Sequence, residues 1–134
     1  GFISGCADIK KFYRYFLKKY FFSICFILLP KIFKISIFKK IKETLQYKNT
    51  KNNLPPAELL SIGVVKKFQG QGIAQTLLTE FIKEMKKREV NQFKVIVGEK
   101  LPRAIAFYEK MGFKFFSKLS IHQGQSSRIY IYSP

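Results

Sequence analysis

The order of apolar segments between residues 57 and 132 limits the fold more than any other feature of the chain. Four short apolar runs are typical of strands, and two segments between them carry apolar residues at helical spacing. The strand-like runs are residues 57–65, 93–97, 113–121 and 128–132, and the helical segments are 72–88 and 102–111. This order predicts an α/β domain with a mixed sheet and flanking helices, and a polar turn at residues 122–127.

The first strand passes into the first helix through Gln-Gly-Gln-Gly-Ile-Ala, residues 69–74. Backbone N–H groups at the start of a helix attract a phosphate, and Gly70 and Gly72 would let one approach. A Walker-type loop would need Gly-Lys-Ser or Gly-Lys-Thr, and a Rossmann turn would need a third glycine at Gln75. Neither pattern is present. Two interpretations remain: a turn that binds a pyrophosphate, and a tight turn without a ligand.

A second motif supports the first interpretation. It consists of Ala104, Phe107, Tyr108, Glu109, Lys110, Gly112 and Phe113, and the first motif consists of Val64, Phe68, Gln69, Gly70, Gly72, Ile73 and Ala74. Together the two motifs resemble the GNAT superfamily of acyl-CoA-dependent N-acyltransferases in residues, order and separation. The resemblance covers residues 57 to about 118 and implies one GNAT-like domain over residues 1–134. It also implies that residues 2–4 end the third strand, and that an N-terminal truncation removes the first two strands.

The resemblance implies an acetyl-CoA-dependent N-acetyltransferase that acts by direct attack of a primary amine of an unidentified acceptor. Tyr108 would be the general acid, because a phenol with a pKa near 10 keeps its proton at neutral pH; the alternative for Tyr108 is core packing. Glu58 would be the base, and the alternative is a solvated carboxylate at a strand start. Leu101 stands where the family usually has an asparagine that contacts the cofactor arm. Backbone groups of the following residues would bind acetyl-CoA: Ile62, Gly63, Val64, Gln69, Gly70, Gln71, Gly72, Ile73 and Ala74.

Residues 8–47 form a basic, aromatic segment that lies outside the resemblance, and the polar linker 48–56 follows it. Asp8 can cap a helix with apolar residues at helical spacing, and a second helical stretch covers residues 34–47. Lys18 and Lys19 interrupt the apolar run, so a membrane-spanning helix is not expected. We interpret the segment as a helical insertion before the fourth strand of the family's fold. It either packs on a core or partner, or lies on an anionic membrane as a peripheral contact.

The net charge of +17, from 25 basic and 8 acidic residues, favours anionic partners. Nucleic acid is not expected, because no zinc finger or aromatic RNA-binding signature accompanies the charge. His122 is the only histidine, and Cys6 and Cys25 have no metal-binding pattern, so no metal is expected. Two cysteines of this kind are typical of a cytoplasmic protein. A homodimer is left open, and the alternative to an enzyme is a non-catalytic basic module that binds a membrane surface or another anionic partner on a GNAT scaffold.

Overall fold

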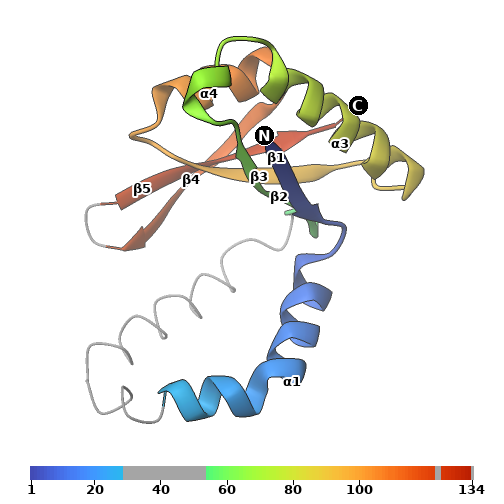
Figure 1. The fold of residues 1–134 in the computed structure, drawn as a ribbon, viewed down its shortest axis with the longest axis vertical. Coiled ribbons are helices and arrows are strands. Elements are labelled where there is room, and N and C mark those ends of the chain that lie inside the picture. The colour runs from blue at the N-terminus through green and yellow to red at the C-terminus, as the bar shows by residue number, and fades with distance from the viewer. Residues whose placement is uncertain (29–53, 123–124, 134) are drawn as a thin grey trace.

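The computed structural model of the chain describes residues 1–28, 54–122 and 125–133. Figure 1 shows a twisted sheet with two helices on one face and a third helix that extends away from the sheet. In chain order the elements are β1 (Phe2–Cys6), α1 (Ile9–Leu28), β2 (Ala57–Gly63), the 3-10 helix η2 (Lys66–Phe68), α3 (Ile73–Lys87), β3 (Phe93–Gly98), α4 (Pro102–Lys110), β4 (Lys114–His122) and β5 (Gln125–Tyr132).

The five strands form one mixed sheet in the order β1-β2-β3-β5-β4. The pair β2–β3 is parallel, because α3 connects these strands, and the other three pairs are antiparallel. The last strand, β5, lies between β3 and β4 and pairs with both. The predicted α/β class, the mixed sheet and the flanking helices are therefore confirmed.

The hydrophobic core lies between the sheet and the helices α3 and α4. Alternate residues of β3 point to this side, so Phe93 and Val95 are buried there together with Tyr130 of β5. The Phe93 ring lies 5.3 Å from Phe81 of α3 and 5.6 Å from Phe113, in edge-on contacts that aromatic pairs favour. Phe93 joins α3 and the turn after α4 to the sheet, and its truncation to alanine would cost about 3–5 kcal/mol.

Most predicted elements lie within one or two residues of the observed ones. Gly112, with φ of 87°, ends α4, and the Phe113 N–H donates to the Tyr108 carbonyl across it. The predicted bounds of the polar turn, residues 122–127, are wrong, because β4 includes His122 and β5 begins at Gln125. Ser126 and Ser127 belong to β5, where they pair with Ser120 and Leu119 of β4. Strand pairing with β3 and β4 extends β5 into a polar stretch that composition alone assigns to a turn.

Helix α1 begins with the predicted cap, since Asp8 Oδ1 accepts hydrogen bonds from the N–H groups of Lys10 and Lys11 at 2.9 and 3.0 Å. The Ile9 N–H donates to the Pro56 carbonyl at 2.8 Å, which places the start of α1 beside the start of β2. The helix predicted at 34–47, and most of the linker predicted at 48–56, lie outside the described residues. Of the helices in the described ranges, none is long and apolar enough to cross a membrane.

Candidate active site

The parallel strands β2 and β3 pair only at their first halves. Ala57, Glu58 and Leu59 are in register with residues 93–95. Strand β2 continues to Gly63 and β3 to Gly98, but beyond these three pairs the two strands do not pair with each other. On its other edge β2 stays paired with β1 as far as Gly63. Beyond Leu59, the backbone groups of β2 that face β3 are therefore outside the ladder and can meet a ligand.

A bulge in β2 accompanies this change. Leu59 is opposite Gly5 of β1 and Ser61 is opposite Ser4, so Leu60 is an extra residue with no paired residue in β1. Such a bulge bends a strand and increases its twist. It lies where the pairing with β3 stops, which gives the loss of register a local structural cause.

The glycine turn, residues 69–72, connects η2 to α3. Gly70 and Gly72 have φ of 82° and 78°, in the left-handed region that residues with a Cβ rarely adopt. A Cβ built on either glycine would meet no atom within 4 Å, so the backbone borders open space there. The Gln69 amide donates to the Val64 carbonyl at 3.0 Å and closes the loop from the inside. The Gln69 N–H is also used internally, by the Lys66 carbonyl at 3.2 Å.

The start of α3 has no side-chain cap. Gly72 occupies the cap position, and no side chain accepts a hydrogen bond from the first N–H groups of the helix. The Lys66 and Lys67 side chains of η2 precede this turn and are exposed. Uncapped N–H groups, the positive end of a helix dipole and two lysines make this turn suitable for a phosphate or pyrophosphate.

Tyr108 lies on α4 and faces the core side of the sheet. It is 5% exposed, and its ring contacts Phe107 and Phe113 with centroids 5.3 and 5.2 Å away. Burial raises the pKa of the Tyr108 phenol above its ordinary value of 10.0. A phenol in this setting keeps its proton at neutral pH, as a general acid must, and it packs as a core aromatic as well.

Glu58 lies on the opposite face of the sheet. Its neighbour across the ladder is Lys94, whose ammonium is 3.2 Å from Glu58 Oε2 and donates to the Pro55 carbonyl at 2.8 Å. Both side chains are largely buried, with 14% and 7% of their surfaces exposed. Sequence reasoning missed Lys94, because a single lysine in an apolar strand is ordinarily solvent-exposed. Lys94 is therefore a structural partner of Glu58, and the ion pair lies where β2 and β3 are hydrogen-bonded to each other.

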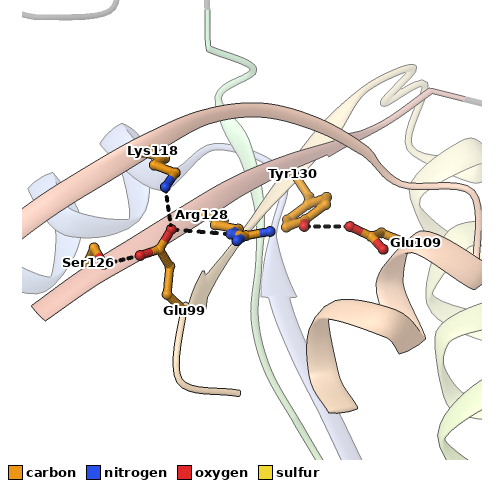
Figure 2. A network of polar contacts seen from close by, with 6 residues as sticks. All are labelled: Glu99, Glu109, Lys118, Ser126, Arg128 and Tyr130. Carbon is orange, nitrogen blue, oxygen red and sulfur yellow. Dashed lines mark hydrogen bonds and ion pairs between the residues drawn. The ribbon is translucent and has the colours of Figure 1, made fainter. Parts of the chain in front are cut away.

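Figure 2 shows a polar network that sequence reasoning also missed. Glu99, just after β3, binds the Lys118 ammonium at 3.1 Å and Arg128 Nε at 3.3 Å, and it accepts a hydrogen bond from the Ser126 hydroxyl. Farther along β5, the Tyr130 hydroxyl donates to Glu109 Oε1 of α4 at 2.8 Å. The network connects the end of β3, the hairpin β4–β5 and the helix that carries Tyr108. Its members come from separate parts of the chain, so no local sequence motif predicts the network.

The hydrogen bond from Ser126, with those from Lys118 and Arg128, lowers the pKa of Glu99 from its ordinary 4.5 to about 2. Glu99 is therefore ionised at any pH at which the protein would work. Leu101, two residues later, starts α4 without a side-chain cap and is more than half exposed. The structure thus fixes the turn before α4 through Glu99.

The structure brings the predicted residues together in two groups. The backbone of residues 62–64 and the glycine turn are continuous along one path from β2 into α3. Tyr108 belongs to the helix-covered side of the sheet, and Glu58 to the other side. Between the two sides lies the region where β2 and β3 cease to pair.

The sequence of residues 43–113 matches the family model described as Acetyltransferase (GNAT) family. No curated protein sequence matches the chain. Among solved structures, Naa50 of Arabidopsis thaliana, in complex with the bisubstrate analogue CoA-Ac-MVNAL, has a TM-score of 0.52 at 21% identity over 57% of this chain and 54% of that one. At that identity the likeness concerns the fold alone.

Two further structures are somewhat closer in sequence. Arabidopsis thaliana NAA60 in complex with acetyl-CoA has a TM-score of 0.52 and 25% identity over 57% of this chain and 47% of that one. The ribosomal-protein-S18-alanine N-acetyltransferase from Escherichia coli has a TM-score of 0.51 and 29% identity over 57% and 53%. The chain therefore spans about half the length of each of these relatives.

Proposed function

This chain belongs to the GNAT family of acetyltransferases, and we propose that it transfers an acetyl group from acetyl-CoA to a primary amine. One observation carries the proposal: β2 and β3 stop pairing beyond Leu59, and the freed β2 backbone leads through η2 into the glycine turn. A long ligand with a peptide-like arm and a pyrophosphate needs these two features in this order. Naa50 with its CoA bisubstrate analogue and NAA60 with acetyl-CoA share the fold.

The residues present fit acetyl-CoA as the co-substrate. Backbone groups of Ile62, Gly63 and Val64 would pair with the pantetheine arm, as a neighbouring strand would. The N–H groups of residues 70–74 would surround the pyrophosphate, with Gln69 holding the turn in shape through its amide. Acetyl-CoA supplies the acetyl group as a thioester.

In the proposed reaction an amine nitrogen forms a bond to the acetyl carbon and the carbon–sulfur bond breaks. A backbone N–H of β2 near the bulge would stabilise the negative charge that develops on the thioester oxygen. Tyr108 would give its phenolic proton to the leaving thiolate, for which its burial and raised pKa suit it. Glu58 is the candidate base that would accept the amine proton. The alternative is a structural role for Glu58, in its ion pair with Lys94.

We propose a cytoplasmic location, because Cys6 is a free thiol and the two cysteines of the sequence follow no disulfide pattern. The acceptor's class is a primary amine, and nothing narrower is proposed. The bisubstrate analogue bound to Naa50 contains the sequence MVNAL, and the Escherichia coli relative is a ribosomal-protein-S18-alanine N-acetyltransferase. Amino-terminal peptides therefore belong in an acceptor screen beside polyamines and amino sugars.

Thermal unfolding with and without acetyl-CoA tests the proposal. A ligand of the folded state at 100 times its Kd stabilises by about 2.7 kcal/mol, so the melting temperature should rise by several degrees. Pantetheine, which lacks the nucleotide phosphates, is the matched ligand and should shift the melting temperature less if the glycine turn binds the pyrophosphate. No rise with acetyl-CoA would exclude the enzyme and favour a non-catalytic basic module on the same scaffold.

A further inference from the structure

Helix α1 exposes a stripe of large apolar side chains. We call Phe12, Tyr13, Phe16, Leu17 and Tyr20 the aromatic stripe; each is between 41% and 54% exposed. At about 100° per residue these positions share one side of the helix. The rings also contact one another along the stripe, with centroids 6.3 Å apart for Phe12–Phe16 and 4.9 Å apart for Phe16–Tyr20. The helix therefore presents a continuous apolar surface and not scattered single residues.

Beside the stripe, the surface of residues 9–21 carries five basic residues and two further exposed aromatics, Tyr15 and Phe21, which are 62% and 57% exposed. Lys10, Lys11, Arg14, Lys18 and Lys19, the basic face, are all exposed, and no acidic residue occurs between residues 9 and 28. Lys19 lies over the rings of Tyr15 and Tyr20, with its ammonium 5.6 Å from each centroid, at the border between the two surfaces. Long lysine side chains at such a border can cover apolar surface while their charges stay in a polar environment.

We propose that α1 docks on the surface of an anionic membrane. The aromatic stripe would enter the boundary between headgroups and acyl chains, and the basic face would lie among the lipid phosphates. A helix with Phe and Leu on one side and Lys and Arg on the other is suited to this interface. The five cations also prevent the helix from crossing the bilayer, so it would lie in the plane of the surface.

Charge and apolar surface together select lipid over other occupants. A second copy of the chain packed stripe against stripe would cover the apolar side, but it would leave both basic faces without an anionic partner. A nucleic acid would neutralise the basic face and leave most of the stripe in water. An anionic bilayer satisfies both surfaces at once.

The position of α1 in the fold leaves room for this contact. Helix α1 extends away from the sheet, and α3 and α4 cover the other side of the sheet (Figure 1). Docking through α1 therefore needs no rearrangement of the hydrophobic core. The inference rests on α1 alone and stands whether or not the chain transfers acetyl groups.

Vesicle co-sedimentation of the whole chain tests the contribution of the basic face to membrane binding. Vesicles of phosphatidylcholine with 30% phosphatidylserine would be compared with pure phosphatidylcholine, at low and high salt. Each cation near an anionic surface strengthens binding about fivefold. The triple variant Lys11→Gln, Arg14→Gln, Lys18→Gln should therefore bind the anionic vesicles about 100-fold more weakly.

The matched control is Lys86→Gln, Lys87→Gln, Lys110→Gln, which removes three exposed cations from α3 and α4. It should bind nearly as the unchanged protein does. An equal loss in both triple variants would overturn the proposal in favour of non-specific charge attraction. Absence of binding to anionic vesicles at low salt would overturn it as well.

The chain has no tryptophan, so the fluorescence of a single introduced tryptophan shows whether that position enters the apolar part of the membrane. Emission of Phe16→Trp should shift to the blue on anionic vesicles and be quenched by lipids labelled in the acyl chain. Phe115→Trp, at an exposed aromatic of β4, should not shift. An unshifted Phe16→Trp on sedimenting protein would overturn the placement of the stripe.

Substitutions in the aromatic stripe distinguish a lipid surface from a nucleic acid or a second copy of the chain as the binding partner. Phe16→Ser with Leu17→Ser should lower vesicle affinity about tenfold or more, since binding scales with buried apolar area, while far-UV circular dichroism checks that α1 stays folded. Two results would replace lipid as the occupant: tight binding of a single-stranded oligonucleotide that survives this variant, or a dimer in ultracentrifugation that the variant dissolves.

Discussion

The buried Tyr130 hydroxyl donates a 2.8 Å hydrogen bond to Glu109 Oε1, the residue next to Tyr108 on α4. Because Glu109 directly follows Tyr108 in α4, the contact restrains the position of Tyr108 relative to β5. Burial, and then the hydrogen bond to Glu109, raise the pKa of Tyr130, so the donor proton is retained at neutral pH. The position of the proposed general acid therefore depends on this hydrogen bond as well as on its core packing.

Replacement of Tyr130 by Phe should lower the free energy of unfolding by about 1.5–3 kcal/mol, because a hydrogen bond to a charged acceptor is lost. Urea denaturation measures this change. Glu109→Gln keeps an acceptor oxygen and should lose less. A Tyr130→Phe protein as stable as the unchanged one would show that the hydrogen bond contributes nothing.

Replacement of Tyr108 by Phe should reduce kcat about 10²–10⁴-fold, the usual contribution of a general acid, while acetyl-CoA binding is kept. An acid must be protonated to act, and burial raises the pKa of Tyr108 above 10.0. The rate of the unchanged enzyme should therefore show no fall from this group until the pH exceeds 10. Phe107→Leu, on the same helix, is the control for packing. Unchanged turnover in Tyr108→Phe removes the residue from the mechanism.

Replacement of Gly72 by Ala should weaken acetyl-CoA binding, because the positive φ disfavours a Cβ and the turn must change shape. Gly112→Ala is the matched control, since Gly112 also has positive φ, of 87°, but ends α4. Both variants should lose about 1–2 kcal/mol of stability. Only Gly72→Ala should raise the Kd for acetyl-CoA in calorimetry, and equal Kd values in the two variants would speak against a pyrophosphate site.

Stability should depend on pH through Glu99. Its pKa is lowered from 4.5 to about 2 in the folded state, so its contribution is full above pH 4.5 and is lost as the pH falls towards 2. The melting temperature of Glu99→Gln should therefore lie below that of the unchanged protein at pH 6, and the two should converge near pH 2. Glu80→Gln removes a single exposed ion pair of α3 and should change the melting temperature little. A constant gap between pH 6 and 2 would contradict the assignment.

Glu58 has two candidate roles that a pair of variants separates. Glu58→Gln and Lys94→Met each break the buried ion pair, and each should cost about 3–5 kcal/mol. If Glu58 also removes the proton from the amine, only Glu58→Gln lowers kcat at pH values where the protein remains folded. Equal kcat in the two variants assigns Glu58 a structural role alone.

Much of the fold was predictable because apolar periodicity is a local signal. The spacing of Leu78, Phe81 and Met85 predicts the buried side of α3, and these residues are buried. The start of β5 was not predictable, because Ser126 and Ser127 become strand through their partners in β3 and β4.

The candidate site divides in the same way. The glycine turn and the Tyr108 motif are short, contiguous patterns, and the sequence presents both. The Glu58–Lys94 pair and the Pro55 carbonyl join residues up to 39 positions apart. Such contacts depend on strand register, and a single sequence carries no register information before the sheet is known.

The place of β5 in the sheet has a consequence for synthesis. A ribosome releases β3 and β4 before β5, yet β5 is the strand that joins them. Until then β4 has no partner, and Glu109 has no tyrosine to hold α4. β4 therefore joins the sheet, and Glu109 gains its tyrosine partner, only after β5 has left the exit tunnel. A chain that ended before Gln125 would leave β4 without β5 beside it, as an unpaired edge prone to aggregation.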